Sequence, residues 1–242
     1  MMAVFCVSTL GLKAELKPLM VKTVDKVVDE SFAKPLAKLP KTQWLSRQGT
    51  RWSFEGGVLK GLPSSAEYQA SKSHHRGTEA RLSIPPTPAE FAASFRFRFI
   101  KGSETVIVPF VEFGHHVCRI RLSKKGTELL AYGETMRVAE ASDLKWESGK
   151  WYSILAELKG EEFVVQFENG LTLYARHATF GKPNPSGGNG VGFACPKGGT
   201  AEVDDMIIWS VAPSYAKGWK QTKAELPVFK HVQVKEKKPK KK

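Results

Sequence analysis

Cysteine, long apolar runs and acidic residues are all scarce in this chain of 242 residues. Three cysteines are too few for the disulfide framework that holds many small exported proteins together. No run reaches the roughly 20 apolar residues that a bilayer-spanning helix needs, so no transmembrane segment is predicted. The 24 acidic residues face 37 lysines and arginines, which gives a formal net charge of +13. Neither a basic helix nor an aromatic RNA-binding signature accompanies this charge, so we expect no specific nucleic-acid partner.

Part of the positive charge is concentrated at the C-terminal end. Lysine occupies six of the last eight positions, and Glu236 is the only acidic residue there. Runs of like charge usually stay solvated and disordered. We therefore predict a disordered, lysine-rich tail at residues 229–242, which makes weak contacts with anionic polymers.

A short apolar run opens the chain and precedes Lys13 and Ala14. We interpret residues 1–14 as a signal peptide that is cleaved after Ala14, although the positive leader of such signals is missing. The alternative is a buried or frayed N-terminal segment. The signal predicts a periplasmic or secreted protein. Cys118 and Cys195 then remain, either as a bridge or as two buried free thiols.

Strand patterns dominate the middle of the chain. Residues 95–99 read Phe-Arg-Phe-Arg-Phe, and this period of two places the aromatic and the cationic side chains on opposite faces of a strand. Gly56-Gly57 and Asn169-Gly170 are pairs typical of hairpin turns. We found no internal repeat and no helix-length periodic stretch between the strands. The sequence therefore predicts an all-β fold, an antiparallel β-sandwich of jelly-roll type, over residues 46–212.

The remaining segments flank this sandwich. We predict a lead-in at residues 15–45 with one strand at 22–28, and an extension at 213–228 with a short helix inside 214–226. Tyr215, Trp219 and Leu226 are expected to pack this extension against the sandwich. The other strands are predicted at residues 52–61 (a hairpin), 80–84, 91–100, 105–113, 116–122, 151–158, 163–167, 171–175, 191–195 and 201–211.

Several of these pieces, in this order, resemble a known family. They are residues 52, 57–61, 95–99, 114–120, 149–152, 191–193 and 203–209. The pattern resembles the concanavalin A-like lectin and glucanase superfamily and, within it, a divergent member of the 3-keto-disaccharide hydrolase domain family. This resemblance implies a jelly-roll fold and an exported carbohydrate-active domain. The Glu-x-Gln motif of better-matched members is missing here.

Glycoside hydrolysis normally needs two carboxyl groups that flank the scissile bond. Retaining enzymes on a similar fold carry Glu-x-Asp-x-Glu along one strand, where period-two spacing puts the three acids on one face. This chain offers Glu202 and Asp204, but Met206 stands at the third position and cannot transfer a proton. We interpret Asp204 and Asp205 as acceptors of hydrogen bonds from a neighbouring loop.

A second group of candidates surrounds the predicted turn at Gly114. Glu112 ends an apolar strand, and His116 and Arg119 follow on the next strand. Glu112 could serve as a general acid or base tuned by His116, with Arg119 binding sugar hydroxyls. Arg121 shares a strand face with Arg119 and is a further candidate for substrate binding. The structural alternative is an ion pair at a strand edge.

The polar face of residues 95–99 is the third candidate. Arg98 could lie on the floor of a sugar groove, which Tyr174 would join from the strand after Gly170. The alternative is the solvated side of a sheet.

The sequence leaves metal binding open. His74 and His75 are adjacent and do not form a two-ligand clip alone, although His115 or Glu112 could complete a site with one of them. Calcium is common in the superfamily that the chain resembles. Candidate oxygen ligands for a divalent metal such as calcium are available at Asp143, Glu147 and Asp204.

Two functions from different classes follow. The first is an exported domain that cleaves a sugar by hydrolysis or lysis in the jelly-roll groove, with Glu112 and His116 as catalytic residues. The second is a non-catalytic carbohydrate-binding or adhesion module of the same fold. The incomplete acid motif favours the second function, whereas the family resemblance favours the first, toward which we lean slightly.

Overall fold

The computed structural model describes residues 15–36, 38–72, 81–84, 88–101, 110–114, 117–123, 126–131, 135–142, 146–182, 190–194 and 200–234, with residues 81, 101, 110 and 123 described by their backbone alone. Several predictions therefore fall outside the described residues. They concern the signal peptide at 1–14, the tail from 235 onward, and the residues His74, His75, His115, His116, Asp143 and Cys195.

Two antiparallel sheets account for most of the described residues. Sheet A contains β1 (Val21–Glu30), β3 (Arg51–Glu55), β4 (Val58–Leu62), β6 (Phe91–Lys101), β11 (Tyr152–Lys159), β12 (Glu162–Phe167), β13 (Thr172–Arg176) and β15 (Thr200–Tyr215). Sheet B contains β2 (Leu45–Arg47), β5 (Arg81–Ile84), β7 (Phe110–Phe113), β8 (Cys118–Ser123), β9 (Gly126–Ala131), β10 (Met136–Ala141), β14 (Val191–Ala194) and β16 (Val232–Gln233). Two short helices, α1 (Ala66–Ala70) and α2 (Trp219–Glu225), complete the described elements.

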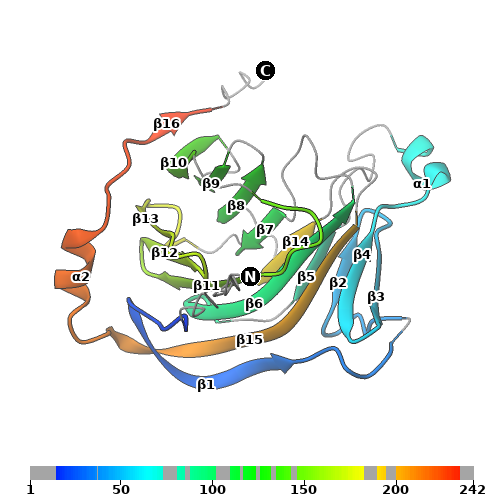
Figure 1. Cartoon of the computed structure of the whole chain (residues 1–242), viewed down its shortest axis with the longest axis horizontal. Helices are drawn as coiled ribbons and strands as arrows, with labels where there is room; N and C mark the ends of the chain where they lie inside the picture. The colour runs from blue at the N-terminus through cyan, green and yellow to red at the C-terminus, as the bar shows by residue number, and fades with distance from the viewer. Residues whose placement is uncertain are drawn as a thin grey trace, which may run out of the picture.

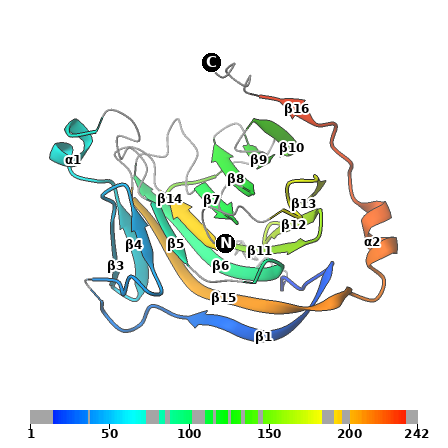
Figure 2. The same ribbon diagram turned by 180° about the vertical axis from the view of Figure 1, so that it is seen from behind.

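The strand order places distant segments side by side. Sheet A runs β13-β12-β11-β6-β15-β4-β3, with β1 also on β15, and sheet B runs β16-β10-β9-β8-β7-β14-β5-β2. Figures 1 and 2 show the long strands β1, β15 and β6 curving along one side of the molecule, with the shorter strands of sheet B across from them. The predicted antiparallel β-sandwich is confirmed.

Aromatic side chains fill the space between the sheets. Phe95, Phe97 and Phe99 on β6 are only 1%, 0% and 2% exposed, as their period-two spacing predicts. Phe95 meets Phe193 of sheet B edge to face, with ring centroids 5.1 Å apart. Each such buried ring contributes about 2 to 3 kcal/mol of hydrophobic stabilisation. Arg96 and Arg98 consequently point to the outer face of sheet A.

Both predicted hairpin turns form. Gly56 and Gly57 have φ angles of +63° and +75° between β3 and β4, a backbone that glycine adopts without steric penalty. Gly170 has a φ angle of +88° at the turn between β12 and β13. These turns set the register of their strands, so the two hairpins could be predicted from the chain alone.

Strand β15 carries an irregularity that no pattern predicted. Asp205 has a φ angle of +48°, and the register with β6 shifts between Asp204 and Ile207. This bulge inserts an extra residue and exchanges the faces of the residues that follow it. Met206, which simple alternation would place beside Glu202, is therefore fully buried in the core.

The flanking segments join the sheets. The lead-in contains β1, which pairs with β15 from Val21↔Tyr215 to Glu30↔Met206. At the other end β15 continues to Tyr215, so α2 is shorter than the predicted helix. Trp219 packs as predicted and is 4% exposed, but Tyr215 remains 42% exposed on the strand. The predicted disordered tail at 229–242 begins too early, because β16 lies within it and pairs with the edge strand β10. No helix in the described part of the chain is long and apolar enough to cross a membrane.

Candidate functional site

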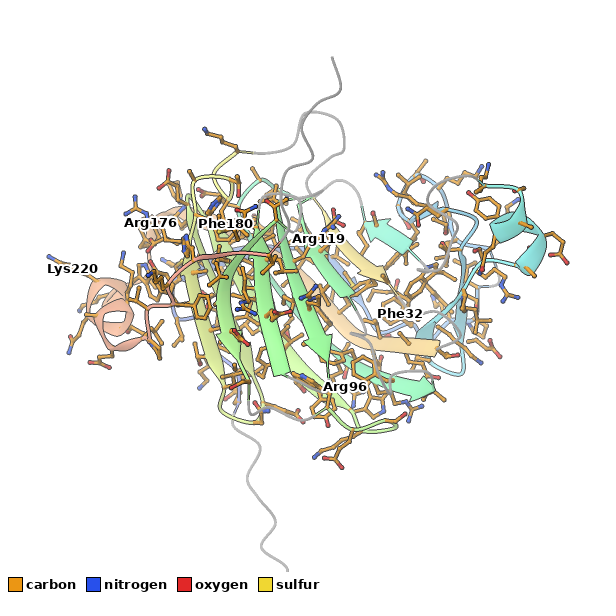
Figure 3. All side chains as sticks on the ribbon, turned by 90° about the horizontal axis from the view of Figure 1, so that it is seen from above. Phe32, Arg96, Arg119, Arg176, Phe180 and Lys220 are labelled. Carbon is orange, nitrogen blue, oxygen red and sulfur yellow. The ribbon has the colours of Figure 1, made fainter. Side chains whose placement is uncertain are left out.

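A row of charged side chains crosses the outer face of sheet B, and we call it the sheet B row. It consists of Glu112 on β7, Arg119 and Arg121 on β8, Glu128 on β9, and Arg137 and Glu140 on β10. Its members alternate along the strands with core residues such as Val111 and Ile120, which fixes their outward direction. Figure 3 shows Arg119 over the middle strands of this sheet.

Glu112 and Arg119 form the buried end of the row. They are directly opposite each other on β7 and β8, and Arg119 Nη2 donates to Glu112 Oε2 over 3.2 Å. The two residues are only 8% and 4% exposed. Removing one partner of a buried ion pair typically destabilises a protein by about 3 to 5 kcal/mol, because the other charge stays buried. The pair lies between two inner strands of sheet B, and the predicted strand-edge location is therefore corrected.

The other end of the row is partly exposed. Arg121 Nε donates to Glu128 Oε2 over 2.6 Å, and Arg137 Nη1 donates to Glu128 Oε1 over 3.0 Å. Arg137 also lies 3.2 Å from Glu140. These four side chains are 16% to 30% exposed. Glu128, Arg137 and Glu140 were not among the predicted site residues, although their alternation with apolar neighbours in β9 and β10 was a usable signal.

Small residues lie beside the buried end. Gly192 on β14 is the cross-strand partner of Glu112, and its neighbours Val191 and Phe193 belong to the core. On the next strand Gly192 pairs with Ser83. A methyl group at Gly192 would lie 3.2 Å from the Leu82 carbonyl oxygen, which is a tight fit, and 3.6 Å from Glu112 Cβ, which is an ordinary contact. The tight approach at Gly192 is therefore to β5 and not to Glu112.

Arg98 lies on the other sheet and not in this row. Its Nε donates to Glu202 Oε2 over 2.6 Å on the outer face of sheet A. The guanidinium carbon of Arg98 lies 4.7 Å from the ring centroid of Trp151, and that of Arg96 lies 5.1 Å from the same ring. Glu202 and Asp204 do share one face, as their spacing predicts, and Glu202 is paired with Arg98. Asp204 and Asp205 were expected to bind a neighbouring loop, but both are paired with Arg96 of β6.

Tyr174 is placed elsewhere again, beneath α2. Its hydroxyl donates to Glu162 over 2.6 Å, and Glu162 also accepts from Trp219 Nε1 and from Lys223 Nζ of that helix. Burial, followed by the bond to Glu162, raises the pKa of Tyr174. Burial acts to raise the pKa of Glu162 as well, but the hydrogen bonds from Lys223, Tyr174 and Trp219 outweigh it and lower the pKa. The cluster therefore fastens α2 to sheet A, a structural role for Tyr174.

The last two candidates are the Cys118 thiol and a metal site. Cys118 is a free thiol that is fully buried on β8, and its desolvation raises its pKa well above the usual value. No group of three or more His, Cys, Asp or Glu side chains that could hold a metal ion occurs among the residues that the structure describes.

Comparison with solved structures places this fold among known ones. The carbohydrate binding module CBM66 from Bacillus subtilis superposes with a TM-score of 0.50 at 12% identity, over 69% of this chain and 96% of that chain. The exoplasmic/lumenal domain of VIP36, in a Ca2+/Man3GlcNAc-bound form, gives 0.52 at 8% identity, over 80% and 94%. A β-1,3-glucanase from Mycobacterium marinum gives 0.52 at 11% identity, over 78% and 100%.

At such low identities the likeness establishes the fold alone. The chain has the antiparallel jelly-roll sandwich that these carbohydrate-binding and glucanase structures share. No protein-family model matches the chain, and no curated protein does.

Proposed function

We propose that this chain is an exported, periplasmic or secreted carbohydrate-binding protein, and that a glycan lies across the sheet B row. The observation that carries the proposal is the alternation of arginine and glutamate across four adjacent strands, from Glu112 to Glu140. The fold likeness to a carbohydrate binding module and to a lumenal domain in a glycan-bound form supports it.

The chemistry of the row suits sugar hydroxyls. A hydroxyl both donates and accepts hydrogen bonds, an arginine donates several in a fixed fork, and a carboxylate accepts up to four. Arg121, Glu128 and Arg137 therefore offer donors and acceptors side by side. The four strands span three inter-strand spacings, about 14 Å, which is long enough for a short oligosaccharide.

The exposed and the buried residues of the row have different proposed roles. The partly exposed residues Arg121, Glu128 and Arg137 reach solvent and would contact the glycan directly. The buried pair Glu112–Arg119 would hold the neighbouring strands in register beneath one end of the ligand. Buried ion pairs contribute little net stability, and retaining one beside a polar surface favours a role in positioning.

Hydrolysis is the second candidate, favoured by the glucanase likeness and by a buried carboxylate at the end of the row. Glu112 would act as general acid or base, assisted by His116. Against it, glycoside hydrolysis needs a second carboxyl group about 5 to 10 Å away, and the carboxylates described in this row all have arginine partners. Sugar release by the wild type that Glu112→Gln abolishes would establish this candidate.

Glycan-array binding of the full chain tests the binding proposal. The double variant Arg121→Gln/Arg137→Gln should lose about tenfold or more in affinity, because two charge-assisted donors are removed. Arg176→Gln is the matched control, since Arg176 is an exposed arginine paired with Glu161 on sheet A. Equal affinity of the double variant and the control would overturn the proposal.

A further inference from the structure

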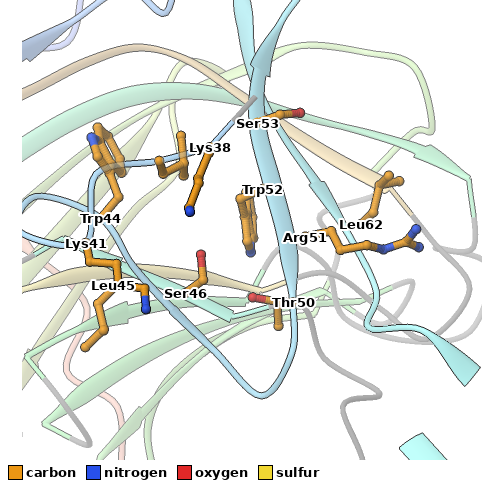
Figure 4. A pocket seen from close by; sticks show the side chains of 11 residues that line it. Lys38, Lys41, Trp44, Leu45, Ser46, Thr50, Arg51, Trp52, Ser53 and Leu62 are labelled. Carbon is orange, nitrogen blue, oxygen red and sulfur yellow. The ribbon is translucent and has the colours of Figure 1, made fainter. Parts of the chain in front are cut away.

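A cavity of about 600 Å³ lies at the other end of the sandwich from the sheet B row. It lies where the edge strands β3 and β2 meet the segment before β2, and Figure 4 shows the side chains that surround it. Its volume falls within the roughly 300 to 1,000 Å³ of typical small-molecule sites. The lining residues are Lys38, Leu39, Lys41, Trp44, Leu45, Ser46, Thr50, Arg51, Trp52, Ser53 and Leu62.

The apolar wall of the cavity is firmly supported. Trp44 and Trp52 are each 5% exposed. Trp44 packs edge to face on Phe54, with ring centroids 5.4 Å apart, and Phe54 packs in the same way on Phe32 at 4.9 Å. Trp52 lies over Gly61, where an added methyl group would come within 2.5 Å of the indole ring. The wall is therefore backed by packed aromatic rings that hold its shape.

The polar wall consists of donors and hydroxyls. Lys38, Lys41 and Arg51 supply three cations, and Arg51 is held beside the cavity because its Nε donates to the Pro63 carbonyl oxygen over 2.9 Å. Among the described residues that line the cavity there is no aspartate or glutamate. The sheet B row, by contrast, balances each arginine with a glutamate. A ligand that matches this cavity must supply the acceptors and the negative charge.

One buried donor lacks an acceptor. The indole nitrogen Nε1 of Trp52 is buried and has no hydrogen-bond partner within the described part of the chain. Figure 4 shows this nitrogen at the end of the ring on the side of Ser46 and Thr50. An indole N–H is a donor only, and burying it without a partner is unfavourable. Because the nitrogen is closed to solvent, a small turn of the Trp52 ring would bring it to the cavity surface, where a ligand oxygen would satisfy it.

From these observations we propose that the cavity binds an anionic sugar, a saccharide unit that carries a carboxylate or a sulfate group. The lysines and Arg51 would bind the anion, the tryptophans and leucines would pack against the C–H face of the ring, and Trp52 Nε1 would donate to a ring substituent. A simple anion would leave the apolar wall uncovered, and a neutral sugar would leave the cations uncompensated. The inference concerns a different surface from the sheet B row and does not depend on the function proposed for it.

Isothermal titration calorimetry of the full chain tests the inference with four ligands: glucuronate, glucose 6-sulfate, glucose and inorganic sulfate. At least one of the two anionic sugars should bind about tenfold or more tightly than glucose and than inorganic sulfate. Whether the carboxylate or the sulfate is preferred identifies the anion. Equal binding of glucose, equal binding of inorganic sulfate, or no binding of either anionic sugar would each overturn the inference.

Variants link the binding to the cavity. Lys38→Gln/Lys41→Gln should lower the affinity for the preferred anionic sugar by about tenfold, whereas Lys34→Gln, an exposed lysine of the same segment outside the cavity, should leave it unchanged. Trp52→Phe removes the indole N–H and should lower the affinity about fivefold. Lys38 and Lys41 are exposed, so their replacement should not impair folding. The double lysine variant therefore tests the inference even if Trp52→Phe fails to fold. Affinity that is unchanged in the double lysine variant would overturn the inference.

Discussion

Glu157 holds the lead-in segment against sheet A, and its removal is the sharpest test of how this fold is built. The side chain is fully buried on β11. Its Oε2 accepts from the backbone N–H groups of Met20 and Val21 over 2.8 and 2.9 Å, and its Oε1 accepts from that of Leu19 over 2.9 Å. One carboxylate thus satisfies three consecutive donors just where β1 begins.

The expected loss follows from those contacts. Glu157→Ala leaves the buried N–H groups of Met20 and Val21 without an acceptor, at about 1 to 3 kcal/mol each. The N–H group of Leu19 is only partly buried and adds less. Part of this is offset, because burial of the carboxylate is itself unfavourable and raises the pKa of Glu157 against the lowering effect of its hydrogen bonds. We therefore expect the free energy of unfolding to fall by about 3 kcal/mol, a large fraction of the stability of a typical domain.

Urea denaturation followed by tryptophan fluorescence measures this loss. Glu161→Ala is the matched control, because Glu161 forms an exposed ion pair with Arg176 and should change stability by less than about 1 kcal/mol. If Glu157→Ala destabilises the protein no more than Glu161→Ala does, the lead-in is not held by this carboxylate and the reasoning fails.

Three further predictions concern stability. Arg119→Leu should lower the free energy of unfolding by about 3 kcal/mol in urea titrations, because Glu112 stays buried; a loss below about 1 kcal/mol would contradict the buried pair. Because the pKa of Glu162 is lowered in the folded state, this residue stabilises the fold above its ordinary pKa of 4.5, and the stabilisation is lost as the pH falls through the folded-state value. Glu162→Gln should therefore flatten the decline of the melting temperature in acid. An unchanged slope would refute this. Gly61→Ala places a methyl group 2.5 Å from the Trp52 ring and should cost about 1 to 3 kcal/mol by denaturant melt, whereas no change would show that the ring can move aside.

Local patterns were enough to predict much of the sandwich. The alternation at residues 95–99 gives the two faces of β6, and the Gly56-Gly57 and Asn169-Gly170 pairs give two hairpins, because side-chain direction and turn geometry depend on neighbouring residues. Trp219 was likewise expected to pack, and it does.

Features that depend on distant pairing could not be predicted. Tyr174 does alternate away from the core of the sandwich, but the outer face there is covered by α2, which lies far along the chain. The bulge at Asp205 buries Met206 through a register shift that needs the neighbouring strand. The pairing of β1 with β15 joins residues as far apart in the chain as Val21 and Tyr215.

The candidate sites were found only in part. Arg119 and Arg121 were predicted together, and they do share the sheet B row. Arg98 was expected near Tyr174. In sheet A, however, strands β11 and β12 lie between the strands that carry these two residues, and α2 covers Tyr174. The cavity at Trp52 left a signal in the sequence, because residues 31–54 contain five lysines and arginines and no acidic residue. Its walls come together only in the folded chain.

The most direct test of the central claim is a crystal structure of the full chain with an oligosaccharide selected on a glycan array. We expect sugar oxygens within hydrogen-bonding distance of Arg121 and Arg137 on the outer face of sheet B. A neutral glycan bound elsewhere, for instance against Trp151 on sheet A, with the sheet B row left untouched, would contradict it.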